Sequence, residues 1–185
     1  DAAVASMVTL NKTASLVARK FTVHACSDVT GFGLLGHGAE MAMGSDVTIE
    51  FDATALPLLP GALGLAKEAR GNLESALKID PTALDGSAYT SLGTLYYKVP
   101  GFPLGFGDKD KARQLLQQAL RINPDGIDPN YFYADFLFAQ GDYAAALPYL
   151  EKAARAPARP GREVADSGRH AEIAALATKV KAKLG

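Results

Sequence analysis

The sequence predicts a mainly α-helical protein, in which a solenoid of helical hairpins follows a small, truncated α/β segment. The solenoid is predicted by a repeat: Ala112 and Ala119 recur 34 residues later as Ala146 and Ala153. A period of this length indicates stacked supersecondary units, each too small to bury its apolar face alone. The α/β segment is predicted by residues 47–52, where apolar and polar side chains alternate with the period of a half-buried strand.

Composition narrows the class of protein. The 185 residues are 48% hydrophobic and 21% charged with a formal net charge of −1, a balance typical of soluble globular chains. The near-zero charge gives no support to nucleic-acid binding. Cys26 is the single cysteine, which excludes an internal disulfide and a thiolate metal cluster. We expect a cytoplasmic protein, or a periplasmic one if a signal peptide was removed.

The chain divides into two parts with different patterns. Residues 1–64 carry three basic and six acidic side chains and mix helix and strand signals, whereas residues 65–185 show helices and turns throughout. In the first part, an amphipathic helix is expected over 3–21, because apolar residues recur there at spacings of 3 and 4. An extended segment is expected at 21–26, and a loop leading into a second helix at 31–43.

The second part shows a specific repeat. Ala69, Ala76 and Pro81 have the same separations as Ala112, Ala119 and Pro124, and an upstream Tyr-x2-Leu-Gly-x2-Tyr pattern is formed by Tyr89, Leu92, Gly93 and Tyr96. These offsets match the tetratricopeptide repeat (TPR), an antiparallel helix pair whose small residues allow close approach and whose proline ends the second helix. Residues 66–185 resemble a family of bacterial TPR proteins, which implies a hairpin solenoid ending in a capping helix and a role in interaction.

The repeat register predicts an inner wall made by the first helix of each hairpin. It includes Thr90, Thr94, Tyr97, Asp128, Tyr131, Asp135 and Phe138. This surface would hold an extended peptide or a basic segment of a partner protein, or its residues would simply pack against neighbouring helices. The positions include no Lys or Arg, which argues against a cationic clamp on a peptide carboxylate. We expect a protein partner on this concave face, possible homo-oligomerisation, and neither nucleic-acid nor membrane binding.

For each of two further segments, the sequence leaves two structural interpretations open. The proline- and glycine-rich loop at 100–107 interrupts the repeat, and it is either a self-packed surface loop or a flap over a ligand. The helix that contains Ala69 and Ala76 lacks a first-helix partner in the sequence. Its apolar stripe is therefore covered either by the preceding segment or by a second copy of the chain.

The most distinctive motif of the first part is HACSDVTGFGLLGH at residues 24–37. Gly31, Gly33 and Gly36 fit the G-x-G-x-x-G pattern of dinucleotide sites. However, Asp28 stands where its charge would oppose a pyrophosphate unless a cation lies between them. His24 and His37 are not spaced as a pair of metal ligands, so both are expected to be structural or exposed, and Cys26 is expected to be a buried thiol.

Residues 5–64 resemble the start of the C-terminal domain of selenophosphate synthetase (selenide, water dikinase), through TLNK, the glycine motif and VTIEFDATALPLLPGAL. The resemblance implies that Asp28 is a magnesium ligand at ATP phosphates, chemistry that suits a carboxylate. The family's N-terminal ATP-binding domain and its catalytic residues have no counterpart in this sequence. We therefore expect an interaction module with an inactive synthetase-like segment and no required cofactor. The alternative is a fragment of a selenide, water dikinase that uses Mg²⁺ and ATP together with a missing domain.

Overall fold

The computed structural model describes residues 2–27, 33–52, 55 and 58–185. The chain divides into two compact units, Asp1–Pro60 and Gly61–Gly185, and each is described here by itself. The helices of the described residues confirm a mainly α fold with TPR-like hairpins.

The described residues of the first unit form three helices: α1 (Ala2–Val8), α2 (Lys12–Ala18) and α3 (Gly33–Ser45). The long helix expected over 3–21 is therefore interrupted between Val8 and Lys12. The strand expected at residues 47–52 is not formed. These residues have an irregular backbone, and no described segment of this unit is a strand. A strand requires a neighbour for its backbone N–H and C=O groups. The β part of the expected α/β segment is thus not confirmed.

Among the described residues of the first unit, few apolar side chains are sheltered. Phe51 packs tightly on α3, where a Cβ on Gly38 would lie 2.5 Å from the ring. Elsewhere large apolar side chains remain exposed, among them Leu10 at 78% and Phe21 at 70%. The described part of this unit therefore lacks the continuous core expected of an independent domain.

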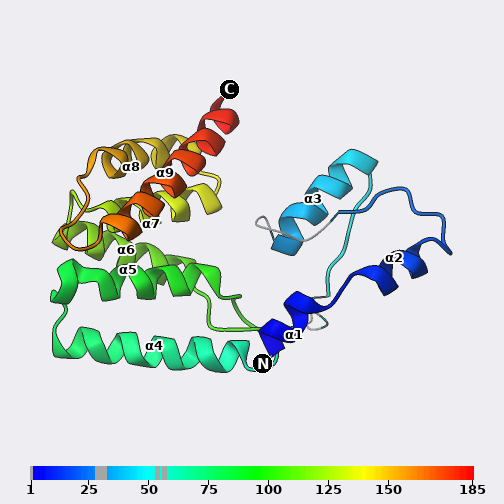
Figure 1. Ribbon diagram of the computed structural model, residues 1–185, viewed down its shortest axis with the longest axis horizontal. Coiled ribbons are helices and arrows are strands. Elements are labelled where there is room, and N and C mark those ends of the chain that lie inside the picture. Colours follow the sequence, from blue (N-terminus) through cyan, green and yellow to red (C-terminus); the bar gives the residue numbers. More distant parts are fainter. Residues whose placement is uncertain (1, 28–32, 53–54, 56–57) are drawn as a thin grey trace. The chain divides into compact units, whose positions relative to one another are not determined.

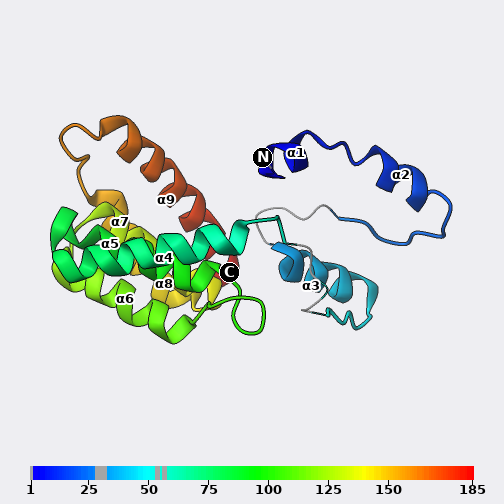
Figure 2. The ribbon, with the colours of Figure 1, turned by 90° about the horizontal axis from the view of Figure 1, so that it is seen from below.

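The second unit stacks six helices in two layers: α4 (Ala62–Ile79), α5 (Ala83–Lys98), α6 (Lys109–Ile122), α7 (Ile127–Ala139), α8 (Tyr143–Arg155) and α9 (Glu163–Leu184). Two antiparallel hairpins, α5–α6 and α7–α8, form its centre, and α9 packs against both α7 and α8 (Figure 1). Helices α5, α7 and α9 contact one another in succession and make up one layer, which carries the predicted inner wall. Figure 2 shows the unit from below, with α4 in front.

The repeated alanines lie where the helices of each hairpin meet. Ala112, Ala119, Ala146 and Ala153 are each 0% exposed. On the facing helix α5, a Cβ at Gly93 would lie 2.8 Å from Leu116 Cγ. Small side chains at these positions therefore allow the two helices of a hairpin to approach closely.

Capping side chains fix where the second helices begin. Asp108 accepts a hydrogen bond from the backbone N–H of Lys111 at 2.9 Å, and Asp142 accepts one from Ala145 at 3.3 Å. These aspartates satisfy backbone donors that a helix N-terminus leaves unpaired. Both second helices thus start from the same local chemistry.

The loop at 100–107 packs on its own unit through one of its two phenylalanines. Phe106 lies edge-on to Tyr96, with ring centroids 5.7 Å apart, and Arg70 of α4 stacks over it at 4.6 Å. Phe102 is 95% exposed. Of the two predicted roles, the structure therefore favours a loop anchored on its own domain, with an exposed tip. None of the described helices is both long and apolar enough to cross a membrane.

Candidate functional site

The predicted inner wall has a charged connection between α5 and α7. The Tyr97 hydroxyl donates a hydrogen bond to Asp135 Oδ2 at 2.5 Å, and Lys98 Nζ lies 2.8 Å from the same oxygen. Burial, with the nearby Asp135 charge, raises the pKa of Tyr97 far above its ordinary value. Tyr97 therefore remains a neutral donor, and Asp135 is satisfied from α5.

A second connection joins α7 to the residues around the start of α9. Asp128 Oδ2 lies 2.8 Å from Arg159 Nη2, and Asp128 Oδ1 accepts from Arg169 Nε at 3.0 Å. Arg159 also reaches Asp166, through a 2.5 Å contact to Oδ1 and a backbone hydrogen bond of 2.7 Å to Oδ2. The aspartates and arginines thus form one continuous network.

Asp166 is the buried anchor of this network. It is 0% exposed, and the hydrogen bonds that it accepts from Arg159 hold its pKa well below the ordinary range for a carboxyl group. A buried carboxylate is tolerated because a guanidinium satisfies its oxygens. The segment between α8 and α9 is therefore fixed by charge pairing.

Arg169 covers part of the predicted wall. Its guanidinium lies 4.7 Å from the Tyr131 ring and 4.5 Å from the Phe132 ring, in cation–π contact with both. It also pairs with Glu172. Tyr131 is thus overlaid by a side chain from α9.

The other predicted positions take no part in these charge pairs. Thr90 is buried at 4% exposure, and its carbonyl accepts from the Thr94 hydroxyl at 2.8 Å. Phe138 packs against Tyr143 of α8, with ring centroids 5.3 Å apart. The structure therefore connects Tyr97 directly with Asp135, and it connects Asp128 with Tyr131 through Arg169. Phe138 instead belongs to the packing of its own hairpin.

A polar hollow of about 400 Å³ opens between these elements. Its walls come from the start of α5, from α7 and from the α8–α9 connection with the first turns of α9; they include Leu84, Asp85, Ser87, Thr90, Ser91, Asp128, Phe132, Arg159, Arg162 and Arg169. Two predicted residues, Thr90 and Asp128, line it. Its hydroxyl, carboxylate and guanidinium groups can donate to and accept from a peptide backbone.

Sequence reasoning missed the cations of this wall. The predicted positions themselves include no Lys or Arg, but Lys98 pairs with Asp135 and three arginines line the hollow. Arg159, Arg162 and Arg169 lie beyond the two hairpins whose register was used. The excess of basic residues after Lys152 was the available signal, but it does not show which side chains turn inward.

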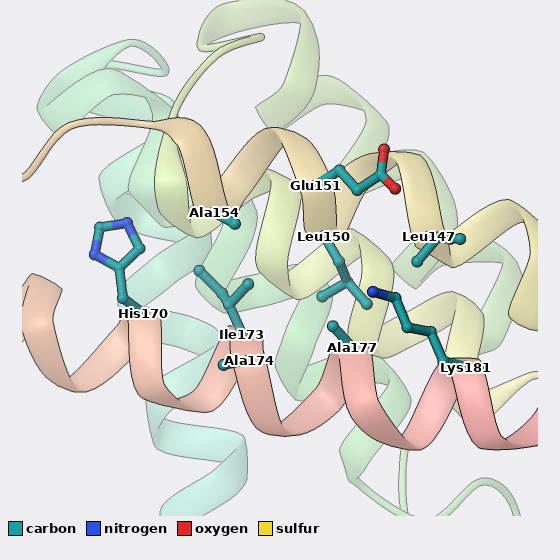
Figure 3. A pocket seen from close by; sticks show the side chains of 9 residues that line it. All are labelled: Leu147, Leu150, Glu151, Ala154, His170, Ile173, Ala174, Ala177 and Lys181. Atoms are coloured by element: carbon teal, nitrogen blue, oxygen red, sulfur yellow. The ribbon is translucent and has the colours of Figure 1, made fainter.

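A second hollow, of about 340 Å³, lies between α8 and α9 (Figure 3). Its floor is apolar, with Leu150 and Ile173 at the centre, while Glu151, His170 and Lys181 stand around it. Residues of the predicted inner wall do not contribute to it. It is therefore a groove distinct from the polar hollow.

The predicted magnesium ligand, Asp28, lies outside the described residues. Among the described residues of the first unit, His37 Nδ1 lies 3.2 Å from Glu40 Oε2 and 3.5 Å from Ser27 Oγ. Cys26 is exposed, so the expectation of a buried thiol is wrong. Within the described ranges, no group of three or more His, Cys, Asp or Glu side chains is arranged to hold a metal ion.

Comparison with known families separates the two parts of the chain. Residues 2–75 match the family model "AIR synthase related protein, C-terminal domain", and residues 104–180 match the model "Tetratricopeptide repeat". The chain joins a synthetase-like segment to tetratricopeptide repeats. The first match extends into α4, and the second begins after α5.

The curated relatives of the synthetase-like segment are selenide, water dikinases. The enzyme of Caldanaerobacter subterraneus is 55% identical over 65 residues, which are 35% of this chain and 19% of that protein. The enzyme of Clostridioides difficile is 43% identical over 67 residues, 36% of this chain and 19% of that protein. The enzyme of Pseudomonas straminea is 48% identical over 59 residues, 32% and 16% respectively. The chain thus spans about a fifth of the length of these relatives.

Proposed function

We propose that the TPR segment is a protein-interaction module that holds an extended peptide of a partner protein in the polar hollow of its inner wall. The observation that carries this proposal is the hollow of about 400 Å³, built from α5, from α7 and from the residues around the start of α9. Tetratricopeptide repeats commonly present binding surfaces of this kind on their concave side. In this proposal the synthetase-like segment accompanies the module and takes no part in peptide binding.

Two features of the hollow support a peptide ligand. Its polar lining offers both donors and acceptors, as an extended backbone requires. Leu84 and Asp85 on its rim have positive φ angles of 50° and 55°, a conformation that non-glycine residues rarely adopt. Strained backbone of this type concentrates at binding sites.

The test is direct binding to full-length protein. Peptides selected from a random display library on the full chain should bind with a measurable Kd by fluorescence anisotropy. Ser91→Tyr fills the hollow from an exposed position of α5, and it should weaken binding at least about tenfold. Ala144→Tyr, at an exposed position of α8, is the matched control and should leave the Kd unchanged. Equal binding by both variants would refute the proposal.

A second candidate function is supported by the selenide, water dikinases that resemble the first segment. Identity of 55% over 65 residues supports an ancestral role of the first segment in selenide-dependent dikinase chemistry. We propose that any such activity requires the ATP-binding part from another polypeptide or from residues outside this sequence. In that assembly Asp28 would hold Mg²⁺ at the ATP phosphates, as carboxylate oxygens do for hard cations.

Titration calorimetry with Mg-ATP separates the two candidates. Heat of binding that disappears in Asp28→Asn but persists in Glu50→Gln would favour the second candidate. Absence of heat at millimolar Mg-ATP would leave the chain without nucleotide affinity and remove that candidate.

A further inference from the structure

One face of α4 is unpartnered within Gly61–Gly185. Its other side is anchored: Leu73 and Leu77 pack on the core, and the hydroxyl of Tyr96 donates to Glu74 at 3.2 Å. Ala69 and Ala76 are exposed. The corresponding alanines of α6 and α8, 43 and 77 residues further along the chain, are each 0% exposed.

The difference has a structural cause. Helix α6 contacts both α5 and α7, and helix α8 contacts both α7 and α9, so each of them has two helical neighbours. Helix α4 has the sequence of a second helix, but α5 is the only helix of its unit that it contacts. It therefore presents a surface that the repeat design normally closes with an antiparallel helix.

The unpartnered face follows a heptad pattern. Six exposed positions at alternating spacings of 3 and 4 cover the whole helix: Ala62, Leu65, Ala69, Asn72, Ala76 and Ile79. Leu65 is 68% exposed and Ile79 is 86% exposed. None of the six is charged, and spacings of this kind are typical of a coiled-coil seam.

We propose that α4 pairs with α4 of a second copy of this chain, in an antiparallel arrangement about a twofold axis. Opposite directions place Ala62 against Ile79, Leu65 against Ala76 and Ala69 against Asn72 of the other copy. Each layer then combines one small and one larger side chain, and all six positions are used. This self-complementarity is what a twofold interface requires.

The pattern also fits a second copy better than an unrelated helix. The two identical helices have 18 residues, about 27 Å each, so every layer along one helix finds its counterpart on the other. Asn72 lies in the layers next to the axis, and a polar residue at such a position favours one register over others. The seam alone is smaller than a standard stable interface of roughly 1,600 Å², so we expect a dimer with a Kd of about 1 to 100 µM.

The first experiment measures the association of the full chain by sedimentation across this concentration range. Wild type should shift from monomer to dimer. Ala69→Glu/Ala76→Glu places carboxylates in the seam and should weaken dimerisation at least about tenfold. Ala144→Glu/Ala175→Glu adds the same charge at exposed positions of α8 and α9 and should leave it unchanged. A wild type that stays monomeric, or a dimer that persists in the seam variant, would overturn the proposal.

The second experiment tests the register. In a Cys26→Ser background, chains carrying Ala69→Cys and Asn72→Cys are mixed and oxidised. The mixture should form cross-linked heterodimers faster than either chain alone. It should also react faster than a mixture of Lys67→Cys and Lys78→Cys, which lie off the seam. If the thiol introduced by Ala69→Cys resists alkylation in a monomer, another segment of the same chain covers the stripe, and pairing between copies is refuted.

Discussion

The hydroxyl of Tyr97 on α5 donates a 2.5 Å hydrogen bond to Asp135 on α7, across 38 positions of sequence. The bond joins the first helices of two successive hairpins, and Lys98 supports it from the α5 side. The bond therefore fixes the distance between α5 and α7 at the inner wall. It also engages the Asp135 carboxylate, one of the charges of that wall.

Removing this hydroxyl tests the connection. Tyr97→Phe should lower the free energy of unfolding by about 0.5–1.5 kcal/mol, the net value of one intramolecular hydrogen bond. Denaturation in urea at pH 7 measures the change. Tyr89→Phe in the same helix is the control. An unchanged midpoint in Tyr97→Phe would show that the bond contributes no stability.

The same pair predicts a dependence on high pH. The pKa of Tyr97 is raised on folding, mainly by burial, so its contribution is complete below the unfolded value near 10. It decreases once the pH exceeds that value, and it is lost as the pH rises through the raised folded value. Spectrophotometric titration to pH 11 should therefore ionise the same number of tyrosines in wild type and Tyr97→Phe. One ionised tyrosine fewer in the variant would contradict the raised pKa.

The buried carboxylate of Asp166 leads to a prediction about the stability of the protein in acid. Its pKa is lowered on folding, chiefly by the hydrogen bonds from Arg159. The stabilisation is therefore present above the unfolded value of about 4 and decreases as the pH falls through the folded value. Asp166→Asn should lower Tm at pH 7 and reduce the difference in Tm between pH 7 and pH 3. Glu151→Gln, at an exposed position of α8, is the control, and equal acid sensitivity in wild type and Asp166→Asn would contradict this role.

Gly93 predicts a steric limit between α5 and α6. A Cβ there would lie 2.8 Å from Leu116 Cγ and 3.2 Å from the Ala112 carbonyl oxygen. Gly93→Ala should therefore destabilise the unit by about 1–3 kcal/mol, despite the higher helix propensity of alanine. Gly71→Ala on α4, where a Cβ meets nothing within 4 Å, should be neutral or stabilising. Equal effects of the two changes would refute the close approach.

Ala112 and Ala69 occupy equivalent positions of the repeat, but we expect them to differ in how well they tolerate a larger side chain. Ala112→Leu places three extra carbons in a closed interface and should cost about 1–3 kcal/mol. Ala69→Leu, at the matching exposed position of α4, should change stability by less than about 0.5 kcal/mol when measured at nanomolar concentration. Chemical denaturation of both variants gives the comparison. A similar loss in both would show that α4 is covered within one chain.

The repeat architecture could be predicted because its signals are local and periodic. Alanines at a fixed spacing and the proline after Ala119 identify helix pairs without knowledge of their neighbours. The alternation at residues 47–52 was misleading, since a strand depends on a partner for its backbone and the described residues supply none. Periodicity alone cannot show whether such a partner exists.

The inner wall was predictable only in part. Register places Tyr97 and Asp135 on one surface, but it does not reveal that Arg169, 41 residues after Asp128, folds back over Tyr131. Arg169 shares its partner Asp128 with Arg159, which also pairs with the buried Asp166. Such long-range charge contacts leave no periodic trace in the sequence.

The absence of any buried residue in α4 has a consequence for how the solenoid opens. In a linear array, each helix is held only by its immediate neighbours, so opening begins where those neighbours are fewest. Within Gly61–Gly185 of the monomer, amide protons of α4 should exchange with solvent first, and those of α7, at the centre of the core, last. Within this unit, a protease should therefore cut first in α4, the terminal helix of the array.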